Sequence, residues 1–151
     1  MTTASPPATD ASTQLVRRLI RATHHTPEAA AGLIAVINTD PKTYLPLALT
    51  MARYGAGPVD TALATAITNT DLTYMESATL EEMIPLRSGI LPHAALAAAE
   101  QRRRQAASDT EIAIAQRKLG GRLGEVGRRR EAVAAAEEAV ALFRQLVAAD
   151  P

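Results

Sequence analysis

The chain contains no cysteine and no tryptophan, and its only aromatic side chains are three tyrosines and one phenylalanine in 151 residues. Without cysteine it cannot form a disulfide, a thiolate metal site or a cysteine nucleophile, and this composition fits a reducing compartment. Scarce aromatics together with abundant alanine favour helices that approach one another closely over a β-sheet.

A net charge is also missing, because 16 basic side chains balance 16 acidic ones. No overall field therefore steers the protein to nucleic acid or to an anionic membrane. No apolar run approaches the roughly 20 residues that a membrane-spanning helix needs. Residues 1–11 are rich in Thr, Ser, Pro and Ala and lack the basic and apolar regions of a secretion signal. We therefore expect a disordered tail over 1–11 and a cytoplasmic protein without membrane contact.

Helix start signals recur along the first half of the chain, whereas the alternation typical of β-strands does not occur. Proline follows Thr26, Asp40 and Gly57, and proline is favoured in the first turn of a helix. The apolar spacing after each proline is that of one helix face. The pattern predicts helices over about 12–25, 26–38, 40–54 and 57–69.

The segment 71–92 is less regular. Asp71 can cap a short helix, and Thr79 with Glu82 fits a capping box that would open a second helix limited by Pro85. After Pro92, an alanine-rich run predicts a longer helix that ends in consecutive arginines, which suit the carboxyl end of a helix.

A helical hairpin is predicted over Thr110–Ala148, opened by a capping box formed by Ser108 and Glu111. Each of its two helices is about 17 residues long, or roughly 25 Å, and the two cannot cover each other's faces completely. Each therefore needs a further neighbour. The predicted apolar stripes are Ile112, Ala115, Leu119, Leu123 and Val126 on the first helix, and Ala132, Val133, Ala136, Val140, Phe143 and Val147 on the second.

This hairpin resembles a tetratricopeptide repeat (TPR) of the kinesin-light-chain-like kind that is common in long actinobacterial repeat proteins, with the match over about 110–151. The resemblance implies an all-α, right-handed stack of antiparallel helix hairpins with about seven to eight helices. We expect one domain, with atypical hairpins over 12–107 and the TPR hairpin over 108–151. The helix-packing positions that carry the resemblance are Leu119, Gly120, Leu123, Gly127, Ala132, Ala139 and Phe143.

The resemblance also implies that the protein is a scaffold or adaptor that binds a peptide or protein on its concave face. The chain departs from the family at Arg117-Lys118, where these repeats commonly carry two asparagines that contact bound peptide. The residues of the first helix that would line the concave face are Ile114, Arg117, Lys118, Gly121 and Glu125.

A second hypothesis is self-association. Repeats of this kind usually need three or more copies for stability, so the last helix could instead pair with a second copy. Val140, Phe143 and Val147 would then form the homodimer contact. The chain would be a dimerising regulatory segment or a fragment of a larger multi-repeat signalling protein.

Catalytic and metal-binding patterns are missing. His24, His25 and His93 have no metal ligand four residues away on a shared helix face, and they are predicted at a helix end and in a loop. Two pairs of adjacent glutamates occur, Glu81-Glu82 and Glu137-Glu138. Adjacent side chains on a helix point about 100° apart, so neither pair is predicted to act as paired carboxylates, and both are predicted to be solvated. No nucleophile elbow or phosphate-binding loop occurs. We expect a protein that is not an enzyme and uses no cofactor or metal.

Positive charge gathers between Arg102 and Arg130, where nine basic residues face three acidic ones. Such runs at helix ends and turns are usually solvated. Nucleic acid is not an expected partner, because no aromatic side chain is interleaved for base stacking.

Overall fold

The computed structural model describes residues 10–52, 57–86 and 89–149. Within these ranges the regular structure is helical and contains no strand, so the predicted all-α class is confirmed. A short 3₁₀ helix, η1 (Pro27–Ala29), precedes α2. The eight α-helices are α1 (Asp10–His25), α2 (Ala30–Thr39), α3 (Pro41–Met51), α4 (Pro58–Thr68), α5 (Tyr74–Glu82), α6 (Pro92–Gln105), α7 (Asp109–Glu125) and α8 (Arg129–Ala149).

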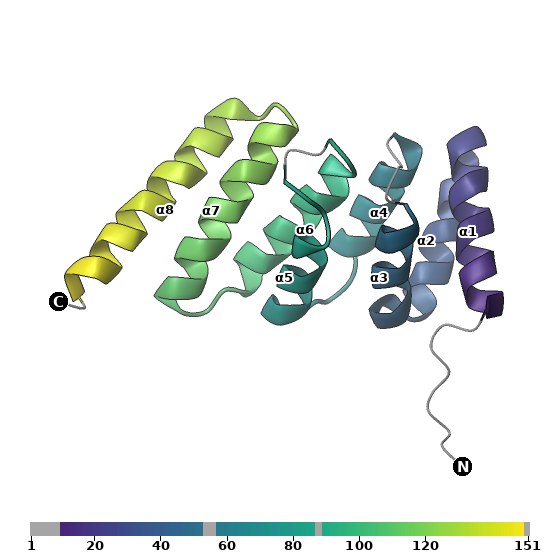
Figure 1. The fold of residues 1–151 in the computed structure, drawn as a ribbon, viewed down its shortest axis with the longest axis horizontal. Helices are drawn as coiled ribbons and strands as arrows, with labels where there is room; N and C mark the ends of the chain where they lie inside the picture. Colours follow the sequence, from purple (N-terminus) through teal and green to yellow (C-terminus); the bar gives the residue numbers. More distant parts are fainter. Residues whose placement is uncertain (1–9, 53–56, 87–88, 150–151) are drawn as a thin grey trace, which may run out of the picture.

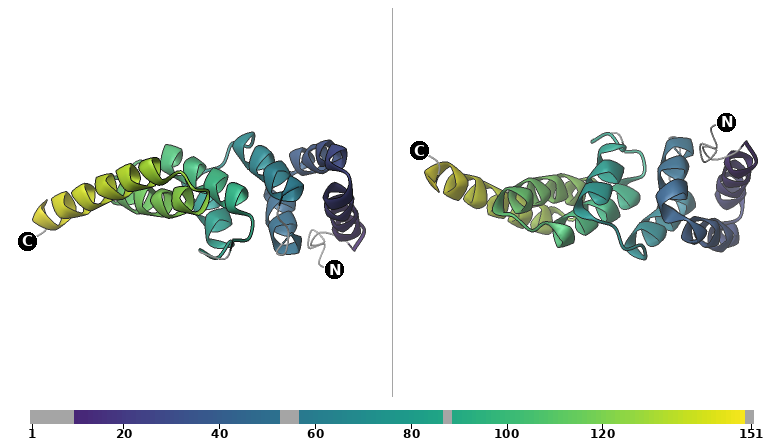
Figure 2. Two further views of the ribbon diagram at one scale, coloured as in Figure 1. Left: turned by 90° about the horizontal axis from the view of Figure 1, so that it is seen from above. Right: turned by 90° about the horizontal axis from the view of Figure 1, so that it is seen from below.

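The helices lie side by side in an elongated row, with α1 at one end and α8 at the other (Figure 1). Views from above and below show the same order (Figure 2). Helix α6 is the centre of the row because it packs against α4, α5 and α7. None of the described helices is long and apolar enough to cross a membrane.

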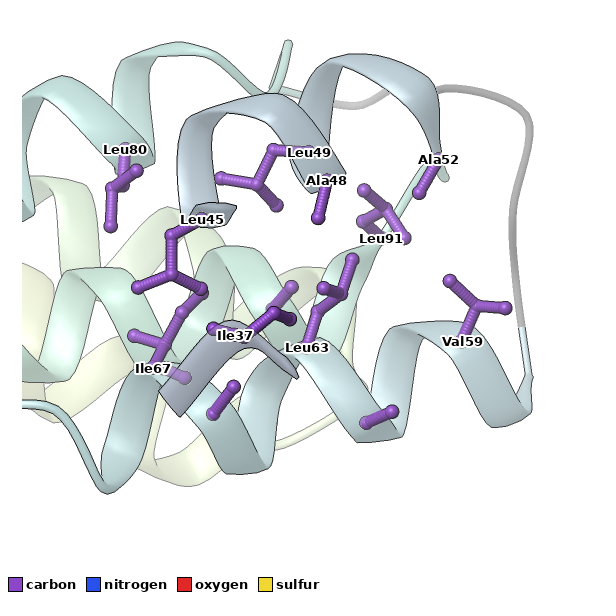
Figure 3. Close-up of a cluster of buried hydrophobic side chains, with 14 of the residues drawn as sticks. Ile37, Leu45, Ala48, Leu49, Ala52, Val59, Leu63, Ile67, Leu80 and Leu91 are labelled. Carbon is purple, nitrogen blue, oxygen red and sulfur yellow. The ribbon is translucent and has the colours of Figure 1, made fainter. Parts of the chain in front are cut away.

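The main hydrophobic core lies between α1 and α6 rather than in the C-terminal hairpin. Its largest fully buried side chains include Ile37, Leu45 and Leu63, which meet between α2, α3 and α4 (Figure 3). A second, smaller cluster of Leu96, Leu123 and Ala135 joins α6 to the α7–α8 hairpin. Leucine and isoleucine bury more apolar surface than alanine, so most of the burial free energy comes from the helices before the hairpin.

Two buried polar side chains connect α4 and α6. The carboxylate of Asp60 accepts hydrogen bonds from the backbone N–H groups of His93 (3.0 Å) and Ala94 (2.7 Å) in the first turn of α6. At the other end, Gln101 Nε2 donates to the carbonyl oxygens of Ile67 (3.0 Å) and Thr70 (2.9 Å). Each helix thus supplies a cap for the other, and the two helices must run parallel.

The structure differs from the sequence predictions at the start of α1 and at His93. Helix α1 begins at Asp10, so the last two residues of the predicted tail are helical, while 1–9 lie outside the described residues. His93 lies in the first turn of α6 rather than in a loop. The predicted end of the third helix falls on 53–56, which also lie outside the described residues.

The described residues of the segment 71–92 form one helix before Pro92, α5, and not two. Its capping box is formed by Thr73 and Glu76: Glu76 N donates to Thr73 Oγ1 (3.1 Å), and Thr73 N donates to Glu76 Oε1 (3.0 Å). Thr79, the cap expected from the sequence, lies inside this helix, and its hydroxyl donates to the carbonyl of Met75 (2.9 Å). Thr73 lies six residues, about 1.7 turns, before Thr79, and its hydroxyl already accepts from the N–H of Glu76, so the helix begins there.

Candidate functional site

The α7–α8 hairpin closes through a tight turn in which Gly127 has a positive φ of 80°. The capping box of Ser108 and Glu111 that was predicted to open it is present. Helix α7 approaches α8 closely at Gly120, where an added Cβ would lie 3.2 Å from the carbonyl oxygen of Ala132 and 3.5 Å from the backbone nitrogen of Ala136. A glycine on one helix facing alanines on the other allows this close contact.

Helix α8 has two apolar faces, and only one of them is covered. The face toward α7 carries the buried Ala135 and Ala139, with half-buried residues at the same three- and four-residue spacing. The opposite face carries Val133, Val140 and Val147, which are 56%, 48% and 73% exposed. Among the described helices α7 is the main neighbour of α8, and in Figure 1 α8 ends the row with its outer side open.

We call this outer surface the free face of α8. Two shallow apolar hollows run along it and meet at Val140 and Arg144. The free face consists of Val133, Glu137, Val140, Ala141, Arg144 and Val147.

The single apolar stripe predicted for this helix is therefore divided between two sides. Ala132, which was placed in the same stripe as Val133, belongs with the side toward α7, whereas Val133, Val140 and Val147 face outward. The physical reason is size, because alanine lets two helix backbones approach more closely than valine does. Phe143 lies half-buried at the edge of the free face.

No family model, curated protein or solved structure matches the chain. The resemblance to TPR proteins therefore rests on the residues of the hairpin alone. The seven positions that carry it lie at Leu119 (half-buried), Gly120 and Leu123 (buried), Gly127 (exposed, in the turn), Ala132 (half-buried), Ala139 (buried) and Phe143 (half-buried).

A buried group of charges attaches α7 to the rest of the molecule. Arg122, 2% exposed, donates through Nε to Glu81 Oε1 (2.9 Å) and through Nη2 to the carbonyl oxygens of Glu81 (2.9 Å) and Ile84. Arg102 Nη1 lies 3.6 Å from Glu81 Oε2, and its guanidinium lies 5.3 Å from the centre of the Tyr74 ring. Glu81, predicted to be solvated, is only 1% exposed. Arg122 also caps the carboxyl end of α5.

Four of the nine basic side chains of 102–130 make contacts within the molecule. Besides Arg102 and Arg122, Arg103 Nε donates to Gln116 Oε1 (3.0 Å). Arg128 pairs with Glu131 and lies 3.8 Å from Glu100. The hydrogen bond from Arg128 lowers the pKa of Glu131 and raises the pKa of Arg128 itself. Arg104, Arg117, Arg129 and Arg130 are exposed, so part of the predicted positive excess remains at the surface.

The predicted concave-face residues of α7 are partly occupied by the chain itself. An added Cβ at Gly121 would lie 3.3 Å from Leu86 Cδ1, so Leu86 covers this position. Glu125 Oε2 accepts a hydrogen bond from Arg122 Nη1 at 3.2 Å. Arg117 is exposed, and Ile114 and Lys118 are half-buried.

Another concave region lies between α3 and α5. It is a cavity of about 220 Å³ with mainly apolar walls that include Leu45, Pro46 and Met75. At its edge Lys42 Nζ lies 3.5 Å from Glu76 Oε2. In the described ranges, including this cavity, no three His, Asp or Glu side chains come together in a metal-binding arrangement.

Proposed function

We propose that this protein is an interaction module, not an enzyme, and that it binds a helical segment of another protein molecule on the free face of α8. The observation that carries the proposal is the row of outward-facing valines on a helix whose other side is already packed. Single exposed apolar residues are common on protein surfaces, but contiguous apolar patches mark sites of association.

The shape of the free face suits a helix. Helix α8 has 21 residues, which corresponds to a length of about 31 Å. Val133, Val140 and Val147 recur every seven residues, so they stay on one side along this length. Burial of each partly exposed valine against a partner would contribute about 1 kcal/mol.

The hairpin is also held in place before any partner arrives. Arg122 and Glu81 join α7 to α5, and Gly120 brings α8 close to α7. A preorganised surface loses little conformational entropy on binding, which favours association.

The proposal includes the architecture. We propose a right-handed α-solenoid of four antiparallel helix pairs, α1–α2, α3–α4, α5–α6 and α7–α8, with the last pair TPR-like. The parallel course of α4 and α6, enforced by Asp60 and Gln101, supports it, because equivalent helices of neighbouring pairs run parallel in such stacks.

Site-specific crosslinking tests the binding surface. The chain has no cysteine, so Val140→Cys and Arg117→Cys each provide a unique attachment point for a photoreactive crosslinker. We expect the probe at 140 to crosslink to a protein, either another copy or a different chain, in extract of the source cells. Unlabelled wild-type chain should compete, and unlabelled Val140→Glu should not.

The probe at 117 reports on the alternative surface, the concave face of α7 predicted from the TPR resemblance. Crosslinking from 117 but not from 140 would assign binding to that face and refute the proposal. Absence of any competed crosslink from 140 would refute it as well.

A further inference from the structure

We infer that the free face of α8 binds the same face of a second copy of this chain, with the two α8 helices antiparallel and the two-fold axis between Val140 and Ala141. The inference rests on the proposed function and names its partner. It goes further because the charges on the free face specify both the occupant and its direction.

Glu137 and Arg144 lie along the middle of the free face, between the row of valines and a row of alanines. They are two helical turns apart, about 10 Å along the axis, which is too far for an ion pair within the helix. Neither residue takes part in any ion pair formed among the described residues. The free face thus presents one unpaired negative charge and one unpaired positive charge.

The midpoint between these two charges is the step from Val140 to Ala141. A two-fold axis through this midpoint, perpendicular to the helix, places Glu137 opposite Arg144 of the second copy, and Arg144 opposite Glu137 of that copy. Each charge lies about 5 Å from the axis along the helix, so the two pairs form at matching heights. Opposite charges on facing positions stabilise such a contact.

The apolar residues match about the same axis. Val140 lies about 0.75 Å from the axis along the helix, and Val133 then comes within about 1.5 Å in height of Val147 of the second copy. On the other side of the charges, Ala141 lies about 0.75 Å from the axis, and Ala134 comes within about 1.5 Å in height of Ala148 of the second copy. A two-fold interface needs a surface that is complementary to itself, and the order of residues along the free face has this property. The small side chains permit an interaxial distance of about 8–10 Å.

The opposite direction is disfavoured by the same charges. In a parallel, in-register pair Glu137 would face Glu137, and Arg144 would face Arg144, so both contacts would be repulsive. A single helix face buries less than the roughly 800 Å² per partner of a standard interface, so we expect micromolar rather than nanomolar affinity.

Sedimentation equilibrium of the full chain, from low to several hundred micromolar, tests the inference. We expect a reversible monomer–dimer equilibrium. Glu137→Arg and Arg144→Glu should each weaken the dimer about tenfold, because the symmetry turns two attractive pairs into two repulsive ones. The double variant Glu137→Arg/Arg144→Glu should return to within a few fold of wild type. Arg117→Glu, an equal charge change at an exposed site on α7, should leave the dimer unchanged.

A second pair of variants tests the apolar contact. Val140→Glu places two carboxylates at the axis and should leave the chain monomeric at every concentration. Met75→Glu, at another strongly exposed apolar residue, should not. Circular dichroism and the thermal midpoint of each variant should match those of wild type, which separates loss of the dimer from loss of the fold.

Disulfide formation reports the direction. Ala141→Cys should form a disulfide-linked dimer on oxidation. Val133→Cys alone should not, but a mixture of Val133→Cys and Val147→Cys chains should form the mixed dimer. A disulfide between two Val133→Cys chains would show a parallel pair and overturn the inference.

The inference is also overturned if the wild-type chain is monomeric at several hundred micromolar, or if a dimer is insensitive to the charge reversals. These outcomes differ from failure of the proposed function. A monomeric chain whose probe at 140 still crosslinks to a different protein would retain the binding surface and lose only the second copy as its occupant.

Discussion

Substitution of Arg122 by methionine should release the α7–α8 hairpin from the rest of the protein. Methionine fills most of the volume of the arginine side chain and removes its five N–H donors. Among the described residues, Glu81, 1% exposed, would keep only Arg102 Nη1, at 3.6 Å, as a charged partner. The carbonyl oxygens of Glu81 and Ile84 would lose the donor that Arg122 supplies. Removal of one member of a buried ion pair costs about 3–5 kcal/mol.

The loss should be local, because Arg122 makes the buried charged attachment between the hairpin and α5. The other attachments of α7 and α8 are the small cluster of Leu96, Leu123 and Ala135, the hydrogen bond from Arg103 to Gln116 and the ion pair of Arg128 with Glu100. We therefore expect amide hydrogen exchange within 109–149 to accelerate by at least about 100-fold, the factor that roughly 3 kcal/mol implies. Exchange in the core helices α2 to α4 should change little.

Urea unfolding followed by circular dichroism at 222 nm measures the total change, and hydrogen exchange with mass spectrometry locates it. Arg117→Met is the matched control, since Arg117 is exposed on the same helix, and it should cost less than about 0.5 kcal/mol. Combining Glu81→Leu with Arg122→Met should recover part of the loss, because no uncompensated carboxylate stays buried. A cost below about 1 kcal/mol for Arg122→Met, or uniformly faster exchange over the whole chain, would refute the reasoning.

Three further predictions follow from the helix contacts and caps. Gly124→Ala should stabilise the protein by about 0.5–1 kcal/mol, since the added Cβ meets no atom within 4 Å, whereas Gly120→Ala should cost about 1 kcal/mol because its Cβ meets the backbone of α8. Thermal unfolding compares the two variants, and equal shifts of the midpoint temperature would contradict the close contact at Gly120. Asp60→Ala should cost about 1–2 kcal/mol in urea unfolding by removing the cap of α6, and a change below about 0.5 kcal/mol would show that the cap is dispensable. The backbone hydrogen bond from Thr73 lowers the pKa of Glu76 below its ordinary value of 4.5, so the ionised carboxylate stabilises the fold above that pH and this contribution is lost as the pH falls through the folded pKa. Glu76→Gln should therefore be less stable than wild type at pH 7 and approach it at about pH 3, and a pH-independent difference would contradict this.

Helix positions were predictable because their signals are local. Proline at the start of α3, α4 and α6, and the capping box of Ser108 and Glu111, involve residues within a turn of one another. In the segment 71–92 the caps predicted at Asp71 and Thr79 were wrong, because Thr73 caps the helix. Both threonines have a glutamate three residues later, so the pattern alone does not separate them.

The attachments between helices had no comparable signal. Glu81 and Arg122 are 41 positions apart, and each lies in a charged stretch that is typical of a solvated helix surface. Asp60 lies within a helix, where a cap for a helix 33 residues later cannot be recognised. Burial of a charge depends on whether its partner arrives at the same place, and that is a property of the packed structure.

Composition and spacing by themselves determined that this chain is all-helical, where most of its helices begin, and that it closes with a hairpin of two long apolar helices, since these features depend on contacts within about four residues. Only the tertiary structure decided which charges are buried and which apolar face of α8 is covered. Alanine and valine are both apolar in a sequence pattern, but only the close approach at Gly120 selects the alanine side and leaves Val133, Val140 and Val147 facing outward.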